Sequence, residues 1–284
     1  MAEKSVIEAI KALRDRTGAG MMDCKHALEQ NDFNVEKSVD WLREKGIAKA
    51  ATRANRTAAE GKTNVSICEK CGKAVIDEVN CETDFVSASD KFIDLVKGVT
   101  STIMQNEPKD VEEAKEMTKT LFTDAAVAVG EKLDLRRFAI IKPEGNQGVG
   151  SYIHMGGKIS VVVLLEKKDD EFANQLAMHI AANNPLYLAL SDVPAADRER
   201  EIAVAKAEVA ADPKLINKPE QVKEQIVERK ADKVLSVSCL YMQNYLLDDS
   251  KTVGQVLKEK GNSVVSFVRY QLGDGIAKNP AQAE

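Results

Sequence analysis

The spacing of hydrophobic positions changes along this chain, and each change marks an expected element. In the first 46 residues, apolar side chains recur at helical spacing over 5–17, 21–30 and 31–46. Two glycines in "TGAG" separate the first two segments, Asn34 is placed to cap the third, and Gly46 is placed to end it. We therefore expect three short helices, a bundle better suited to docking than to catalysis.

The next stretch alternates as strands do and then returns to helical spacing. Residues 63–80 predict a β-hairpin that turns at "EKCG". Phe92 and the apolar residues after it predict an amphipathic helix over 87–104, followed by a helix over 111–130 and a strand over 136–143.

A second hairpin over 150–166, turning at "MGGK", and a second helix over 170–183 repeat this plan. Phe92 and Phe172 begin the two helices at equivalent places. The repetition favours two related α+β halves, although the identity between them is too low to prove a duplication.

Two charged segments with narrow apolar stripes follow, over 194–213 and 218–236. Such stripes are typical of a two-helix hairpin that projects from the body of a protein. We expect the chain to return through strands over 236–247 and 263–272, with a helix over 252–261 between them.

These elements predict an α+β fold divided into successive parts. The parts are a helical domain (1–48), a basic Ala-rich linker (49–63), the N-terminal half of the core (64–145), the C-terminal half (146–190 and 234–272), an inserted helical hairpin (191–233) and a C-terminal tail (273–284).

Composition narrows the class of protein. The 284 residues are 44% hydrophobic and 30% charged, which is ordinary for a globular protein, and the net charge of −5 disfavours a broad nucleic-acid-binding surface. The N-terminus has no long apolar core, so we expect no signal peptide, and the longest apolar run is too short to cross a bilayer. Five cysteines, an odd number, suit a reducing cytoplasm.

Two motifs resemble ligand sites without completing one. "GKT" at 61–63 ends like a phosphate-binding loop, but Arg56 stands where that loop needs glycine. "CEKCG" places Cys68 and Cys71 at a spacing that chelates metals, and Cys81 is a candidate third ligand, but no fourth is in view. A zinc or thiol enzyme built on these cysteines stays open as an alternative, while we expect no metal and no cofactor.

The three histidines, His26, His154 and His179, form neither an HExxH motif nor a pair on one helical face. No GxSxG nucleophile elbow is present. We interpret His179, between Leu176 and Ile180, as a satisfied structural group, and we expect the protein not to be an enzyme.

Phe85 stands in "NCETDFV", where an expected strand gives way to an expected loop. A phenylalanine in this place ordinarily caps the hydrophobic core. Its neighbours Glu82, Thr83 and Asp84 instead indicate a solvated loop tip, from which an aromatic side chain is suited to enter another protein's pocket.

Several motifs in the chain together resemble one family, elongation factor Ts. They are "RTGAGMMDCKHAL", "EVNCETDFV", "GSYIH", "AMHIAANNP" and "KTVGQVLKE", in this order along nearly the whole chain. The resemblance implies a ubiquitin-associated-like three-helix domain, a core of two α+β halves and an inserted antiparallel helical hairpin. It also implies a guanine-nucleotide exchange factor for elongation factor Tu, the GTPase that carries aminoacyl-tRNA.

By the same resemblance, Thr83, Asp84, Phe85 and Val86 intrude near the Mg²⁺ site of the partner and loosen its hold on GDP. The matched docking residues are Arg14, Met21, Met22, Lys25, His154 and His179. The hairpin mediates homodimerisation in some members, and the sequence leaves this open here. An adaptor built on the three-helix module alone is a further alternative, but it has no need of the "TDFV" segment.

Overall fold

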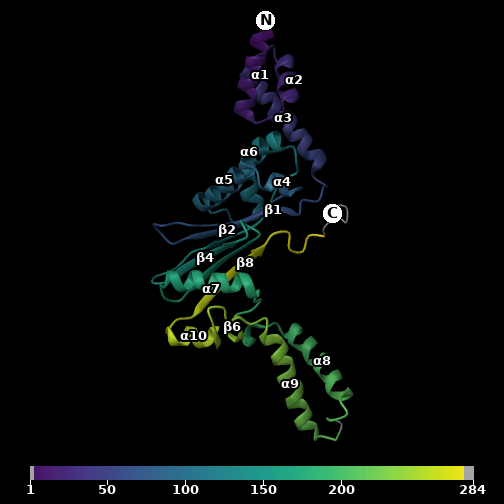
Figure 1. Cartoon of the computed structure of the whole chain (residues 1–284), viewed down its shortest axis with the longest axis vertical. Helices are drawn as coiled ribbons and strands as arrows, with labels where there is room; N and C mark the ends of the chain where they lie inside the picture. Colours follow the sequence, from purple (N-terminus) through teal and green to yellow (C-terminus); the bar gives the residue numbers. More distant parts are fainter. Residues whose placement is uncertain (1–2, 216, 278–284) are drawn as a thin grey trace. The chain divides into compact units, whose positions relative to one another are not determined.

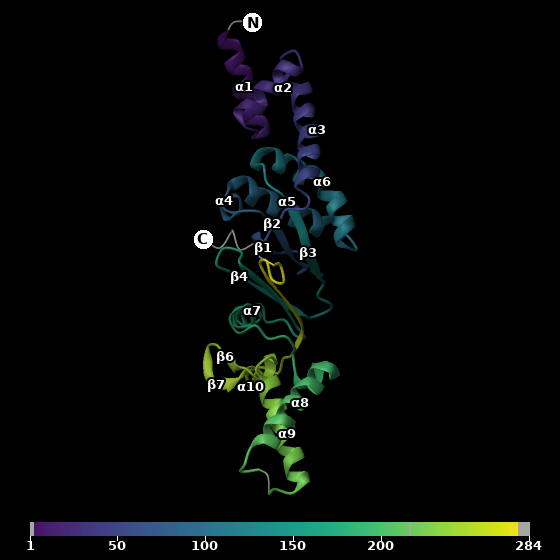
Figure 2. The same ribbon diagram turned by 90° about the vertical axis from the view of Figure 1, so that its right-hand side faces the viewer.

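The computed structural model describes residues 3–215 and 217–277. The chain divides into two compact units. The first comprises the described residues of 1–142, 153–160 and 270–284, and the second comprises 143–152 and 161–269. Figures 1 and 2 show the elements of both units in two views. The predicted tail over 278–284 lies outside the described residues.

Three helices open the first unit: α1 (Glu3–Thr17), α2 (Met21–Gln30) and α3 (Val35–Arg53). They enclose a small core that includes Leu13, Leu28 and Leu42. The prediction of three short helices is thus confirmed for this part of the chain.

The prediction that Gly46 ends the third helix is wrong, because α3 continues through it to Arg53. Glycine serves a different purpose here. A Cβ atom at position 46 would lie 2.5 Å from Cγ2 of Val127 on α6, closer than side chains tolerate. The glycine therefore lets α3 pack closely on α6. The irregular connection between α3 and β1 is correspondingly shorter than the expected linker.

An antiparallel sheet with the order β1-β2-β3 forms the core of the first unit. Its strands are β1 (Glu60–Ile67), β2 (Ala74–Cys81) and β3 (Asp134–Ile141). Every residue of the central strand β2 is buried. Helices α5 (Asp90–Asn106) and α6 (Val111–Val129) supply the rest of the core. The predicted hairpin and both helices are confirmed.

A second sheet has the order β4-β5-β8, from β4 (Gly148–His154), β5 (Ile159–Leu165) and β8 (Val264–Gln271). Helix α7 (Asp170–Asn183) packs closely on β4: a Cβ atom on Gly150 would lie 2.3 Å from the carbonyl carbon of Ala173. Glycine at position 150 is therefore what permits this approach.

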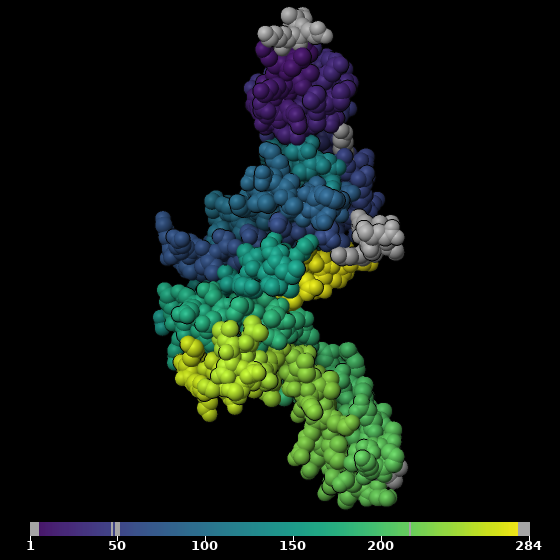
Figure 3. Space-filling view, viewed as in Figure 1, coloured from purple at the N-terminus to yellow at the C-terminus, as the bar shows by residue number. Residues whose placement is uncertain are grey.

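Helices α8 (Ala195–Ala211) and α9 (Glu220–Ser236) form the expected hairpin. They bury a narrow apolar seam of Ala205, Val209 and Val227 between them. Figure 1 shows the two helices, in green, side by side, and in Figure 3 the atoms of this green region form one continuous mass. Within the described residues, no helix has the length and apolar character that a membrane span requires.

The strand expected over 236–247 is wrong. The segment folds as a 3₁₀ turn, η2 (Leu240–Met242), and a two-residue strand, β6 (Asn244–Tyr245), which pairs with β7 (Asp248–Thr252). A short apolar run such as "CLYM" has the composition of a buried strand but no alternation to prove it. The predicted helix after it is α10 (Val253–Glu259), which begins with a Thr252–Gln255 capping box.

Candidate partner-binding site

The "TDFV" segment lies at the end of β2 as one helical turn, α4 (Asp84–Ser87), rather than as the expected loop. Thr83 caps this turn: its hydroxyl accepts a hydrogen bond from the backbone N–H of Val86 at 3.3 Å. The hydroxyl of Ser87 donates to the carbonyl of Asp84 at 2.8 Å and closes the turn from the other side. Local side-chain hydrogen bonds of this kind are easy to miss in a sequence pattern.

Two of the four side chains of α4 are exposed, and the other two anchor the turn. Phe85 is 85% exposed and Asp84 is also exposed. Val86 is half-buried against the core beneath β2, and Ser87 is buried. Phe85 therefore does not cap the core of this chain. It is a large apolar side chain presented to solvent on an anchored turn.

Glu131, which begins the segment leading to β3, holds the start of α4. One of its carboxylate oxygens accepts hydrogen bonds from the backbone N–H groups of Glu82 and Thr83, both at 3.0 Å. The other accepts from the hydroxyl of Thr83 at 2.6 Å. Hydrogen bonds to an ionised carboxylate are among the strong ones, so Glu131 fixes the backbone that carries Phe85.

Glu82 returns this contact. Its carboxylate accepts a hydrogen bond from the backbone N–H of Lys132 at 2.7 Å and pairs with Arg56 at 3.3 Å. We call the reciprocal contact of Glu82 and Glu131 the glutamate clasp. The local sequence around Glu131 gives no sign of this role, because nothing in it shows that the start of β3 meets the end of β2.

The predicted docking residues of the N-terminal helices are all exposed: Arg14, Met21, Met22 and Lys25. Met21 is 59% and Met22 72% exposed at the start of α2. Unbranched thioethers adapt to many surfaces, and exposed pairs of them are typical of binding faces.

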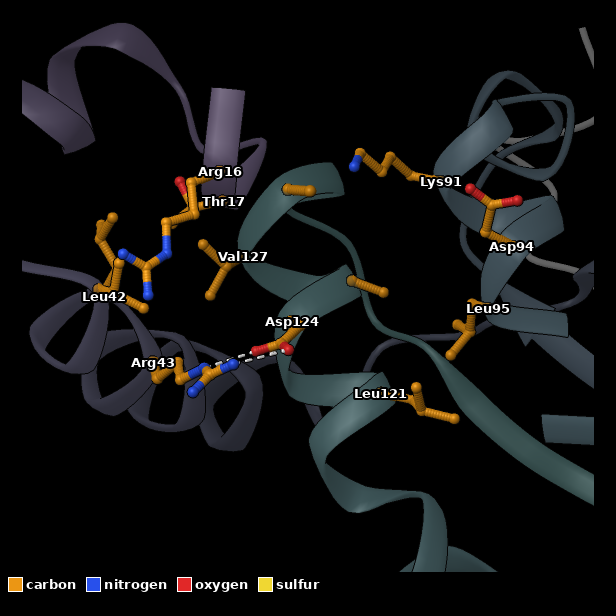
Figure 4. A pocket seen from close by; sticks show the side chains of 13 residues that line it. Arg16, Thr17, Leu42, Arg43, Lys91, Asp94, Leu95, Leu121, Asp124 and Val127 are labelled. Atoms are coloured by element: carbon orange, nitrogen blue, oxygen red, sulfur yellow. Dashed lines mark hydrogen bonds and ion pairs between the residues drawn. The ribbon is translucent and has the colours of Figure 1, made fainter. Parts of the chain in front are cut away.

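A pocket of about 300 Å³ lies between these helices and α5 and α6 of the same unit. Figure 4 shows Arg43 facing Asp124 across it. The two side chains form a bidentate ion pair, with nitrogen–oxygen distances of 2.8 and 3.0 Å. The pocket holds no histidine and no thiol. This ion pair joins α3 to α6.

The two histidines predicted to dock a partner differ in exposure. His154 is half-buried at the end of β4, between Ile153 and Met155, which are 41% and 73% exposed. His179 is fully buried, so its ring makes no direct contact with a partner in this conformation. This agrees with its interpretation as a satisfied structural group.

His179 instead organises the segment around β6. Its Nδ1 accepts a hydrogen bond from the backbone N–H of Leu246 at 3.2 Å, and Nε2 lies 2.9 Å from Oε1 of Gln243. This pattern requires the tautomer with the proton on Nε2. Burial lowers the pKa of His179, which favours the neutral ring. Leu246 and Leu247 are about half exposed and are further candidates for a binding face.

The cysteine motif does not converge with Cys81. Cys68 and Cys71 lie at the turn between β1 and β2, whereas Cys81 is buried at the far end of β2, opposite Glu60. Among the described residues, no three acidic, histidine or cysteine side chains gather as a metal site would require. The three-cysteine zinc site considered as an alternative is therefore excluded by the length of the hairpin.

A family model described as Elongation factor TS matches residues 82–274 of this chain. The chain belongs to the elongation factor Ts family. A protein of this name from Pediococcus pentosaceus is 43% identical over 95% of this chain and 92% of its own length. One from Limosilactobacillus reuteri is 41% identical over 98% of this chain and 95% of its own length. One from Acholeplasma laidlawii is 41% identical over 95% of this chain and 93% of its own length.

Membership in the elongation factor Ts family confirms the resemblance drawn from the sequence motifs. It makes the chain a translation elongation factor with a role in nucleotide exchange. The matched region begins at Glu82 and so includes α4 and the glutamate clasp, while the longer matches also cover the N-terminal helices.

Proposed function

We propose that this protein is a guanine-nucleotide exchange factor for elongation factor Tu and that Phe85 is the side chain that disturbs the nucleotide site. The observation that carries the proposal is the 85% exposure of Phe85 on a turn that Thr83 and Glu131 hold in place. Exposing a phenylalanine is unfavourable in water and is offset when the ring enters a pocket of a partner.

The mechanism rests on the role of Mg²⁺ in holding a nucleotide. The ion bridges phosphate oxygens and protein oxygens and offsets their negative charge. An aromatic wedge that shifts the surroundings of this ion weakens the grip on the phosphates. Asp84, exposed beside Phe85, adds a negative charge that competes for the partner's hydrogen-bond donors or perturbs the water around the metal.

The binding free energy of GDP is too large for the side chain of Phe85 to offset alone. A nanomolar nucleotide is held by about 12 kcal/mol. Exchange requires only that the factor bind the nucleotide-free partner more tightly than the GDP-bound one, and the coupling is reciprocal. A large interface, above about 2,000 Å², therefore has to hold the factor in place while α4 acts.

We assign this docking to the N-terminal helices and to the turn after β4. Arg14, Met21, Met22 and Lys25 supply the first surface, and His154 belongs to the second. His179 acts through the segment that it positions. In this proposal the N-terminal helices form a ubiquitin-associated-like domain, the two sheets with their helices form related halves, and the parts follow the division predicted from the sequence.

The exchange reaction takes place in the cytoplasm, where the protein meets its partner without nucleic acid or a membrane. Homodimerisation through α8 and α9 stays open. The experiment that tests the proposed function is release of a fluorescent GDP analogue from elongation factor Tu. We expect release to accelerate with the concentration of this protein until it saturates, and an unchanged release rate would contradict the proposal.

A further inference from the structure

The turn between β1 and β2 carries two thiols that have no part in the proposed nucleotide exchange. Cys71 is exposed and Cys68 is half-buried, and both are free. The turn lies at the opposite end of the hairpin from α4: Ile67 pairs with Ala74 beside the turn, and Glu60 pairs with Cys81 next to the clasp. A function of these thiols is therefore separable from the action of Phe85.

Two backbone hydrogen bonds close the turn that carries the two cysteines. The N–H of Cys68 donates to the carbonyl of Lys73, and the N–H of Gly72 donates to the carbonyl of Cys68, both at 2.8 Å. Gly72 has a φ of 71°, in the left-handed region that glycine occupies without strain. The result is a Cys-x-x-Cys turn closed at both ends.

The thiol of Cys68 has a lowered pKa. A side-chain hydrogen bond with Cys71 lowers the pKa of Cys68, followed by backbone hydrogen bonds from Cys71 and Lys70 and the charge of Lys73. The ammonium of Lys73 is held in place by Glu107, at 2.5 Å, and by the carbonyl of Met104, at 2.6 Å.

The three buried thiols of the described chain have raised pKa values. Burial raises the pKa of Cys81 to about 12, and it also raises the pKa of Cys24 and of Cys239. All three side chains are fully buried. Since the thiolate is the reactive form, these cysteines are inert toward reagents that reach the turn.

We propose that Cys68 and Cys71 form a reversible thiol–disulfide site, in which Cys68 attacks a small-molecule disulfide and Cys71 resolves the product. The sulfur of Cys68 bonds to one sulfur of the reagent as the S–S bond of the reagent breaks, which releases one thiolate. The sulfur of Cys71 then bonds to that of Cys68 and displaces the second thiolate. Two cysteine thiols are oxidised, one disulfide is reduced to two thiols, and the released thiolates take up the two cysteine protons as pH dictates.

The test is exposure of the full chain to glutathione disulfide, followed by acid quenching and intact mass measurement. We expect the wild type to lose two hydrogens without retaining a glutathione adduct, and to recover its mass after treatment with a dithiol reductant. Cys71→Ser should accumulate a glutathione adduct on Cys68, because no second thiol resolves it. Cys68→Ser should react more slowly than Cys71→Ser at neutral pH.

The controls are a double variant that lacks both thiols and a parallel measurement of GDP release. The double variant Cys68→Ser/Cys71→Ser keeps the three buried thiols and should take up nothing. Adducts spread over Cys24, Cys81 and Cys239, or a wild type that keeps a stable adduct, would overturn the proposal. A wild type that binds one Zn²⁺ per chain and thereby resists oxidation would also overturn it, since the pair would then be a metal ligand set. Acceleration of GDP release by the oxidised and reduced protein, measured in parallel, tests exchange independently.

Discussion

Glu82 and Glu131 each accept a hydrogen bond from the backbone of the segment that carries the other. The N–H of Glu82 lies 3.0 Å from Oε2 of Glu131, and the N–H of Lys132 lies 2.7 Å from Oε1 of Glu82. This clasp joins the end of β2 to the start of β3 at the point where α4 begins. Together with the packing of Val86 and the burial of Ser87, it explains how an exposed phenylalanine is held on a short turn.

Replacing Glu131 by glutamine should weaken the clasp. The amide keeps the shape but loses the charge that strengthens three hydrogen bonds, so we expect a loss of about 1–2 kcal/mol of stability and a several-fold lower maximal acceleration of GDP release. Glu113→Gln is the matched control, since its carboxylate also accepts a backbone hydrogen bond, from Lys109 at 2.8 Å, but in the first turn of α6 and not from a residue of the clasp. Equal effects of the two variants on maximal acceleration would contradict a role for Glu131 in positioning Phe85.

Docking should be separable from the wedge. Changing Met21 and Met22 together to serine removes two exposed thioethers, and we expect the half-saturating concentration in GDP release to rise about tenfold, or roughly 1.4 kcal/mol. The maximal acceleration should stay the same. Ile7→Ser is the control, because Ile7 is 64% exposed on α1 but is not among the predicted docking residues. If the double variant lowers the maximum instead, these methionines take part in more than docking.

Much of the fold follows from periodicity. Helices α2, α5 and α7 begin within a few residues of their expected positions because buried residues recur along one face and a polar cap precedes α5 and α7. The segment around Leu240 was missed because its run of apolar residues has no alternation. Strand β7 was missed because its sequence, "DDSKT", is polar throughout.

The site was predictable only in part. The exposure of Phe85 could be inferred from its acidic neighbours, whereas Glu131 lies 48 residues from Thr83 and only the sheet brings the two together. Gly46 was misjudged for the same reason. A glycine near a helix end signals a stop, but one that faces another helix signals close packing, and the sequence does not distinguish these cases.

Gly46→Ala should test this packing. Alanine favours a helix interior by about 1 kcal/mol over glycine, so an isolated helix would gain stability. Here the added Cβ meets Val127 at 2.5 Å, and overpacking costs about 1–3 kcal/mol, so we expect a net loss of up to about 2 kcal/mol. Trp41, the chain's one tryptophan, lies on α3 and reports unfolding by fluorescence. Val127→Ala removes the Cγ2 atom that the new Cβ meets. The double variant Gly46→Ala/Val127→Ala should therefore be more stable than Val127→Ala alone.

Asp77 should make stability depend on pH. Burial raises its pKa to about 7, while its hydrogen bond from Thr100, at 2.6 Å, acts in the opposite direction. The folded state therefore binds a proton more tightly than the unfolded chain, whose aspartates titrate near about 4. This group's contribution to stability is full below about pH 4, falls as pH rises, and is lost above about pH 7.

Asp77→Asn removes this titration. The wild type should lose on the order of 1–3 kcal/mol more unfolding free energy than Asp77→Asn when the pH rises from 5 to 8. Urea unfolding at the two pH values measures it. Asp94→Asn, at an exposed position, should leave the difference as it is. An unchanged difference in Asp77→Asn would mean that Asp77 keeps an ordinary pKa in the folded protein.

The central claim is that Phe85 acts on the partner and not on the fold of its own chain. The most direct test is release of fluorescent GDP from elongation factor Tu by Phe85→Ala, with Leu186→Ala, 61% exposed in the wild type, as the control. We predict that Phe85→Ala keeps its stability to within about 0.5 kcal/mol and still binds elongation factor Tu, but accelerates release far less than the control. Release at the wild-type rate by Phe85→Ala would contradict the account.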